Sequence, residues 1–91
     1  MVGPSGTVRL GSVRVATLGP WSVRLWPRGA GVVGDLTAPV HQGAQQLEQA
    51  GGWTVDIITA TAVRWTWQDV TRTGPQTWTV RGIPSMEEVS T

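Results

Sequence analysis

The sequence predicts an all-β protein: a small antiparallel β-barrel or sandwich with one long loop and at most one short helix. Segments rich in Val, Ile, Thr and Trp recur along the chain, and Gly or Pro bounds most of them. Within these segments apolar and polar residues alternate, as expected for strands with one buried face. Only residues 40–50 have a helix-forming composition.

The strongest strand signal lies in residues 53–84, which hold four of the six tryptophans. Residues 73–76 read Thr-Gly-Pro-Gln and predict a turn between two strands. After this turn Trp78 and Val80 alternate with polar residues, which predicts that both point into a core. Gly82 and Pro84 then end this strand.

The strand before that turn shows a shift in its alternation. Val63, Trp65 and Trp67 share one parity, but beyond Asp69 the apolar position is Val70. A slip of one residue moves every side chain to the opposite face of a sheet. The pattern therefore predicts a bulge or a strand end beside Asp69.

The predicted core combines these strands with the strand at residues 53–60, where Val55 and Ile57 share a face. The predicted core residues are Val55, Ile57, Val63, Trp65, Trp67, Trp78, Val80 and Ile83. Each buried tryptophan removes about 150–250 Å² from water, so a few tryptophans can dominate a core of this size.

The N-terminal third predicts further strands. Residues 1–6 form a flexible arm, and residues 7–18 form two strands with a tight turn or bulge at residues 11–12. Gly and Pro at residues 19–20 break the chain. Residues 21–26 alternate again and predict one more strand.

The remaining segments predict a long loop and a short tail within one domain spanning residues 1–91. Residues 27–52 show no clean periodicity, so they predict a long loop with a possible short helix. Residues 85–91 predict an acidic tail, in which Met86 and Val89 add a last half-strand.

A loop of this length in a small domain is usually functional or ordered by a partner. We therefore expect residues 27–52 to contact a neighbouring subunit. The predicted inter-subunit contact residues are Arg28, Val32, Val33, Leu36, His41, Gln45 and Leu47.

Charge and composition restrict the possible functions. The chain has seven arginines, no lysine and a net charge of +1, which argues against a strong nucleic-acid binder. No cysteine is present, so disulfides and thiolate metal sites are excluded. The sequence lacks an apolar run of transmembrane length and a signal-peptide pattern, so we expect no membrane association and assembly in the cytoplasm.

Catalysis is not predicted, and neither is a cofactor or a metal. His41 is the only histidine, and one histidine is not a metal site. Asp56 and Asp69 are better explained as strand or turn residues than as a general acid and base. Residues 29–34 spell GxGxxG, but no convincing helix follows them, so no phosphate-binding loop is predicted.

Tryptophan beside arginine raises one alternative, a single-stranded nucleic-acid module of the OB type. Arg64 to Trp67 and Trp78 to Arg81 would then stack bases and hold phosphates. The competing explanation is a tryptophan core with arginine on the outer face. We favour the core, because Trp65, Trp67 and Trp78 fall on apolar parities.

Residues 40–84 resemble the phage head-closure or head-tail stopper family, small β-barrel proteins that continue the connector below the portal. The matching features are Gln46 to Gly51 at a loop, the strand at residues 53–60 and Asp69-Val70. The residues Trp78-Thr79-Val80-Arg81-Gly82-Ile83 match a closing strand of the form aromatic-x-Val-x-Gly-Ile. The N-terminal half matches only as a generic pair of strands.

This resemblance implies a structural virion protein: a stopper or adaptor subunit that forms a homo-oligomeric ring between portal and tail. Portal or adaptor proteins and tail proteins would be its partners, and genomic DNA would pass through the channel as cargo. The resemblance implies no catalysis. A tail terminator or another small virion barrel remains the nearest alternative.

Overall fold

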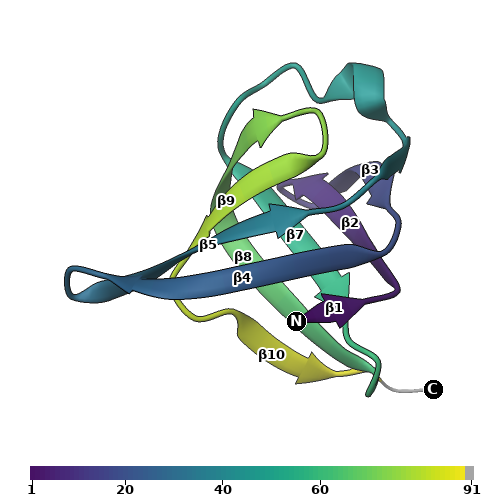
Figure 1. Ribbon diagram of the computed structural model, residues 1–91. Helices are drawn as coiled ribbons and strands as arrows, with labels where there is room; N and C mark the ends of the chain where they lie inside the picture. The colour runs from purple at the N-terminus through teal and green to yellow at the C-terminus, as the bar shows by residue number, and fades with distance from the viewer. Residues whose placement is uncertain (90–91) are drawn as a thin grey trace.

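The computed structural model describes residues 1–89 and consists almost entirely of antiparallel strands (Figure 1). The elements in chain order are β1 Val2–Gly3, β2 Ser5–Leu10, β3 Val13–Leu18, β4 Trp21–Arg28, β5 Gly31–Thr37, β6 Val40–Gln42, the 3-10 turn η1 Ala44–Gln46, β7 Trp53–Ile58, β8 Val63–Gly74, β9 Thr77–Arg81 and β10 Ser85–Glu88. The all-β prediction is confirmed.

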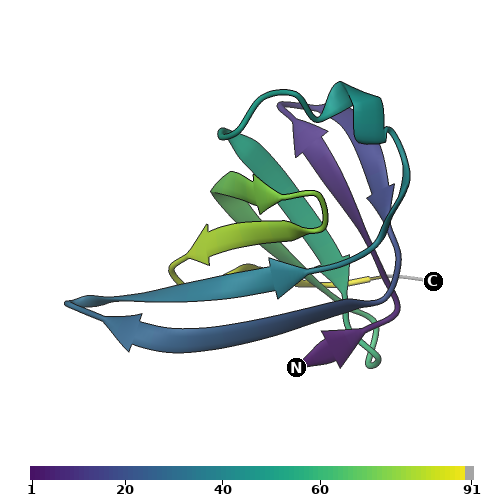
Figure 2. The ribbon, with the colours of Figure 1, turned by 45° about the horizontal axis from the view of Figure 1, so that its top comes forward.

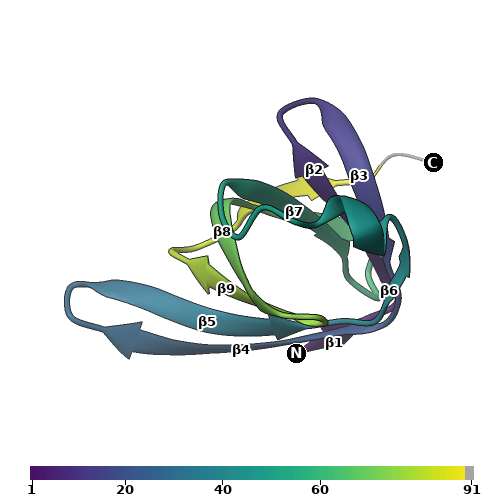
Figure 3. The ribbon, with the colours of Figure 1, turned by 90° about the horizontal axis from the view of Figure 1, so that it is seen from above.

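The strands follow the order β1-β4-β5-β9-β8-β7-β2-β3-β6, and β10 pairs with β8 outside this path. The sheet curls around an interior (Figure 3), but the strands at the two ends of the path do not pair with each other. The fold is therefore a sandwich-like roll, which is the second of the two expected architectures, and the sheet does not close into a barrel.

Strand β8 joins the two layers of the roll. Its first part pairs with β7 and β10, and residues 71–74 pair with β9. Trp53 lies opposite Val70 and Val55 lies opposite Trp67, so two residues of β8 face one residue of β7 between them. Asp69 has a φ of 55° at this point. The predicted bulge is confirmed, and it lets the apolar parity change while both halves keep their core face.

The predicted tight turns are also present. The turn at residues 11–12 joins β2 to β3, and Gly11 adopts a φ of 62°, which a residue without a Cβ tolerates at low cost. Residues 75–76 join β8 to β9, and residues 19–20 separate β3 from β4.

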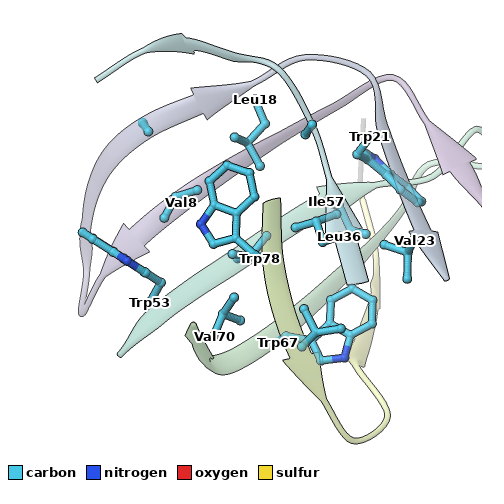
Figure 4. Packing of buried hydrophobic residues seen from close by; sticks show 14 of the residues in the cluster. Val8, Leu18, Trp21, Val23, Leu36, Trp53, Ile57, Trp67, Val70 and Trp78 are labelled. Atoms are coloured by element: carbon cyan, nitrogen blue, oxygen red, sulfur yellow. The ribbon is translucent and has the colours of Figure 1, made fainter. Parts of the chain in front are cut away.

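The core lies inside the roll (Figure 4). Its buried hydrophobic residues are Val8, Ala16, Leu18, Trp21, Val23, Leu36, Ala38, Leu47, Trp53, Val55, Ile57, Trp67, Val70, Trp78 and Val80. Five predicted core residues are therefore confirmed: Val55, Ile57, Trp67, Trp78 and Val80.

Three predicted core residues differ from expectation. Ile83 is 80% exposed, so its assignment to the core was wrong. The inward parity of Trp78 and Val80 continues to residue 82, where Gly82 adopts a φ of 75° and redirects the chain. Val63 and Trp65 are only partly buried, because they lie toward the open end of the roll.

The prediction of a long loop at residues 27–52 was wrong for residues 27–42, whereas residues 43–52 contain no strand and hold one short 3-10 helix. Strands β4 and β5 form a hairpin that pairs from Ser22 and Thr37 out to Arg28 and Gly31. Two of the glycines that suggested a loop have different roles: a Cβ on Gly34 would overlap the side chain of Leu25, and Gly29 lies in the turn with a φ of 61°. Gly34 therefore marks close contact between strands, and Gly29 marks the turn of the hairpin.

The only helical element in residues 1–89 is η1, a single 3-10 turn. It follows Gly43, whose φ of 83° directs the chain past the backbone of Val15. Leu47 then enters the core with 2% exposure. Burial of Leu47 therefore stabilises this segment, because a single helical turn is too short to be stable alone.

The ends of the chain are more ordered than predicted. Residues 1–6 are not a free arm, because β1 pairs with β4 and the amino group of Met1 donates to the carbonyl of Val23 at 3.0 Å. Met86 lies in β10, so the expected final half-strand is present, but Val89 lies just beyond its end. The end of the predicted tail, residues 90–91, lies outside the described residues.

Within the described part of the chain, no helix is long and apolar enough to cross a membrane.

Candidate functional site

The β4–β5 hairpin projects beyond the rest of the roll (Figure 2). Strand β9 pairs with β5 only from Val33 to Thr37, so the tip around Gly31 has no third strand beside it. Strand β1 pairs with β4 only at Trp21 and Ser22. The outer edge of β4 is therefore open over residues 24–28.

The outer face of this hairpin is basic and aromatic. Alternation along β4 places Arg24, Trp26 and Arg28 on one face. The guanidinium carbon of Arg24 lies 5.7 Å from the ring centroid of Trp26, a cation–π geometry. Arg81 of β9 lies across from Val33 of β5 and extends the same face.

The charge of this face is positive but not uniform. Three arginines, Arg24, Arg28 and Arg81, are accompanied by one carboxylate, Asp35, which faces Arg24 in the β4–β5 register. On the other face of β4 the side chain of Leu25 is 38% exposed. The hairpin thus combines apolar area with an excess of positive charge.

A second surface is an apolar hollow at one end of the roll, with a volume of about 420 Å³. It is lined by Met1, Val2, Trp21, Thr59, Ala60, Thr61, Val63, Trp65 and Met86. A neighbouring hollow of about 710 Å³ shares Val2, Trp21 and Ala60 with it. We call the first of these the apolar hollow.

Two tryptophans give the apolar hollow a fixed wall. The indole nitrogen of Trp21 donates to the carbonyl of Ile58 at 3.1 Å. The ring of Trp65 lies 5.9 Å from that of Trp21 and 6.0 Å, edge to face, from that of Trp67. Packing on both sides orders Trp65 although it is only partly buried.

The two acidic residues of β10 lie on opposite faces of the sheet, and only Glu88 shares the face of the apolar hollow. Glu87 pairs in register with Arg64, and their side chains form an ion pair at 3.6 Å. Glu88 pairs with Val63, which lines the hollow, and no carboxylate–cation contact forms at Glu88 within residues 1–89. Both glutamates are exposed.

The only buried charged side chain in residues 1–89 belongs to Asp56, which is 9% exposed. Its carboxylate accepts from Arg9 Nε at 2.5 Å and from Thr66 Oγ1 at 2.7 Å. The hydrogen bond to Asp56 raises the pKa of Arg9. These contacts join β2, β7 and β8, so the carboxylate has a structural role.

The structure does not bring the other titratable residues into a chemical site. His41 is exposed on β6, and Asp69 is exposed in the β8 bulge. No group of three histidine, cysteine or carboxylate side chains within residues 1–89 could hold a metal ion. The GxGxxG match spans the tip of the hairpin and β5, where no helix follows.

Two of the three tryptophans of the alternative nucleic-acid platform are not available for stacking, and the third, Trp65, is accessible only in the apolar hollow. Trp67 is 2% and Trp78 is 0% exposed, and Trp65 packs against the core. Trp26 is the accessible aromatic beside arginine, and the sequence analysis did not single it out. Its shared parity with Arg24 and Arg28 was the available signal.

The predicted inter-subunit residues fall into three groups. Arg28, Val32 and Val33 lie in the projecting hairpin. His41 and Gln45 are exposed near η1, distant in the chain from that hairpin. The buried Leu36 and Leu47 belong to the core of the domain itself, so they are not available for an interface.

Comparisons with protein-family models, with curated proteins and with solved structures find no match to this chain.

Proposed function

We propose that this chain is a structural virion protein: a head-tail connector stopper or adaptor subunit that forms a ring between portal and tail. One observation carries the proposal: the small domain leaves two separate surfaces unpartnered, the projecting hairpin and the apolar hollow. A ring subunit needs two such surfaces, one for each neighbour.

The distribution of exposed apolar residues supports assembly. Seven large hydrophobic residues are exposed within residues 1–89: Met1, Val2, Leu10, Val13, Leu25, Ile83 and Met86. Three of them line the apolar hollow, and Leu25 lies on the hairpin. Apolar residues that gather on a surface commonly mark a site of protein contact.

The resemblance of residues 40–84 to the stopper family supports the same proposal. The residues that carry it occupy one connected part of the roll: Asp69 forms the β8 bulge, and Trp78 and Val80 are the core residues of β9. Gly82 then turns the chain at the end of the strand. A tail terminator or another small virion barrel would use the same framework.

One observation favours a candidate from another class, an OB-like module for single-stranded nucleic acid. Trp26 lies between Arg24 and Arg28 on the outer face of the hairpin, and a base can stack on an accessible ring while arginine neutralises phosphate. With three arginines and one aspartate on that face, few phosphates would be neutralised. The ring subunit is therefore the better supported proposal.

The test is reconstitution with the products of neighbouring genes. The protein is mixed with a candidate portal and a candidate tail protein, and the complexes are imaged by negative-stain electron microscopy. We expect a ring of this protein on the portal, and its presence in purified particles by mass spectrometry. A protein that neither joins the portal nor occurs in particles contradicts the proposal.

A further inference from the structure

We infer that the β4–β5 hairpin of one copy docks in the apolar hollow of the next copy. This inference rests on the proposed ring function and names the contact that builds the ring. The occupant of the hollow is thus a second copy of this chain. The contact is heterologous, because it joins two different surfaces.

The hairpin has the form of an inserting element. Its tip extends past the strands that support it, and its outer backbone edge is open over residues 24–28. Leu25 and Trp26 provide apolar area on opposite faces of one strand. Gly31 and Gly29 at the tip carry no side chains that would block entry.

The apolar hollow has the form of a receptor. Its wall is ordered in the single chain, since the indole of Trp21 is hydrogen-bonded and that of Trp65 is packed. A preformed apolar site binds with a smaller loss of conformational entropy than a flexible one. Met86, 65% exposed, and Val2, 73% exposed, would lose water on docking.

The charges of the two surfaces are complementary. The hairpin face carries Arg24 and Arg28 with a single aspartate, and β10 presents Glu88 on the face of the hollow, across from Val63. Glu87 lies on the opposite face of the sheet, where it forms an ion pair with Arg64. Charges of opposite sign at the rim favour the correct encounter and set the register of the contact more than its strength.

The tip of the hairpin lies away from the apolar hollow, although Met1 of the hollow is hydrogen-bonded to Val23 near the base of the hairpin. In Figures 1 to 3 the tip of the hairpin projects at one side, and the far end of β10 lies toward the other. One chain therefore cannot fill its own hollow with its own hairpin. Repeated head-to-tail contacts generate a closed ring when the rotation closes.

The test uses two variants that each remove one surface. The hairpin variant is Arg24→Glu with Arg28→Glu, and the hollow variant is Met86→Asp. All three positions are exposed, so we expect both variants to fold, which circular dichroism and thermal melting check. Matched controls are Arg14→Glu and Val13→Asp, which change an exposed arginine and an exposed apolar residue on β3.

Assembly is measured by analytical ultracentrifugation, alone and on the candidate portal, under the condition in which the wild-type protein assembles. Each surface variant alone should remain monomeric, with association weakened at least about tenfold. A mixture of the two variants should form one-to-one heterodimers and nothing larger, because only one pair of intact surfaces remains. The β3 controls should assemble like the wild type.

Three results of the assembly experiment overturn the inference. If wild-type rings form and both surface variants still assemble, the contact is wrong although the ring function stands. If the mixed variants remain monomeric while the wild type assembles, the contact is not between hairpin and hollow. Wild-type protein that never assembles, alone or on the portal, contradicts the inference and the proposed function together.

A binding titration tests the remaining alternative, in which the hairpin binds single-stranded nucleic acid. A fluorescein-labelled 20-nucleotide single strand is titrated with each protein. We expect no binding that depends on Arg24 and Arg28. Binding lost in the hairpin variant, by a protein that does not self-associate, overturns the inference in favour of a nucleic-acid site.

Discussion

The indole nitrogens of the core tryptophans differ in their partners. Trp53 donates to the carbonyl of Gln49 at 2.8 Å, and Trp67 donates to the carbonyl of Gly82 at 3.1 Å. The buried indole nitrogen of Trp78 has no hydrogen-bond partner among residues 1–89. Burial of an unpaired donor costs free energy, so the packing of Trp78 must offset it.

This difference predicts unequal losses of unfolding free energy for the same substitution. Trp67→Phe removes a hydrogen bond and leaves the carbonyl of Gly82 unpaired, at a cost of about 1 kcal/mol beyond lost packing. Trp78→Phe removes an unsatisfied donor, so it should cost less than Trp67→Phe. Urea denaturation of both variants measures this, and a larger loss at Trp78 contradicts the assignment. Trp78→Ala should still cost about 3–5 kcal/mol.

The carboxylate of Asp56 predicts a second residue-level effect. Asp56→Ala leaves Arg9 and Thr66 without their acceptor and should cost about 1–2 kcal/mol, reduced by the solvent that reaches Arg9. The exposed Asp35 provides the control, since Asp35→Ala removes a carboxylate without these contacts. Equal losses of unfolding free energy would contradict the structural role.

The raised pKa of Arg9 determines how this contact responds to pH. The folded state favours the charged guanidinium, so its contribution is complete below the pKa of arginine in the unfolded chain. It disappears only as the pH rises through the raised pKa, far above neutrality. Deprotonation of Arg9 should therefore cause no loss of unfolding free energy between pH 6 and pH 9.

At the scale of elements, β8 is a single strand that serves two layers because of its bulge. Asp69 adopts the left-handed conformation there, which aspartate tolerates better than branched residues. The neighbouring Gln68 is equally exposed but does not have a positive φ.

The positive φ of Asp69 in the bulge predicts that substitution by a branched residue costs free energy through backbone strain, apart from any loss of side-chain contacts. Asp69→Val should lower the free energy of unfolding by about 1–2 kcal/mol, and Asp69→Gly should be nearly neutral. Gln68→Val, one residue earlier, should cost less than about 0.5 kcal/mol. Thermal and urea unfolding test the series, and equal losses at residues 68 and 69 would refute a strained bulge.

The hairpin predicts a pattern of hydrogen exchange within residues 27–52. Strand β5 is paired on both sides from Val33 to Thr37, so its hydrogen-bonded amides should exchange slowly in the monomer. The tip at residues 29–30 and the segment at residues 48–50 should exchange fast. Uniform fast exchange over residues 31–37 would restore the disordered loop that the sequence suggested.

At the scale of the whole molecule, the domain is small, and several of its exposed apolar residues gather at the apolar hollow. Small domains bury a limited fraction of their surface and gain stability from neighbours. The charge is also uneven: residues 1–40 carry a net +3 and residues 41–91 a net −2. In the proposed ring this asymmetry brings positive and negative surfaces together.

The same charge balance predicts weak binding of single-stranded DNA. A net charge of +1 neutralises few phosphates, and Trp67 and Trp78 are buried away from any base. We expect no appreciable affinity at physiological salt in a fluorescence titration. Micromolar or tighter binding that Trp26→Ala abolishes would instead support a nucleic-acid module.

Local patterns in the sequence determined much of the fold. Alternation around Trp78 and Val80 predicted a buried strand, and the parity shift at Asp69 predicted the bulge, because strand side chains alternate strictly between faces. Glycine with proline or serine marked the breaks. These signals depend only on residues that are close in the chain, so they can be recognised in a single sequence.

Tertiary structure decided the features that depend on distant residues. Gly34 suggested a loop, but it lies under Leu25 in a hairpin, and Leu47 enters a core formed by other strands. The apolar hollow brings Met1 and Met86 to one surface from opposite ends of the sequence. Such proximity arises from the order of strands in the curled sheet, which local periodicity does not encode.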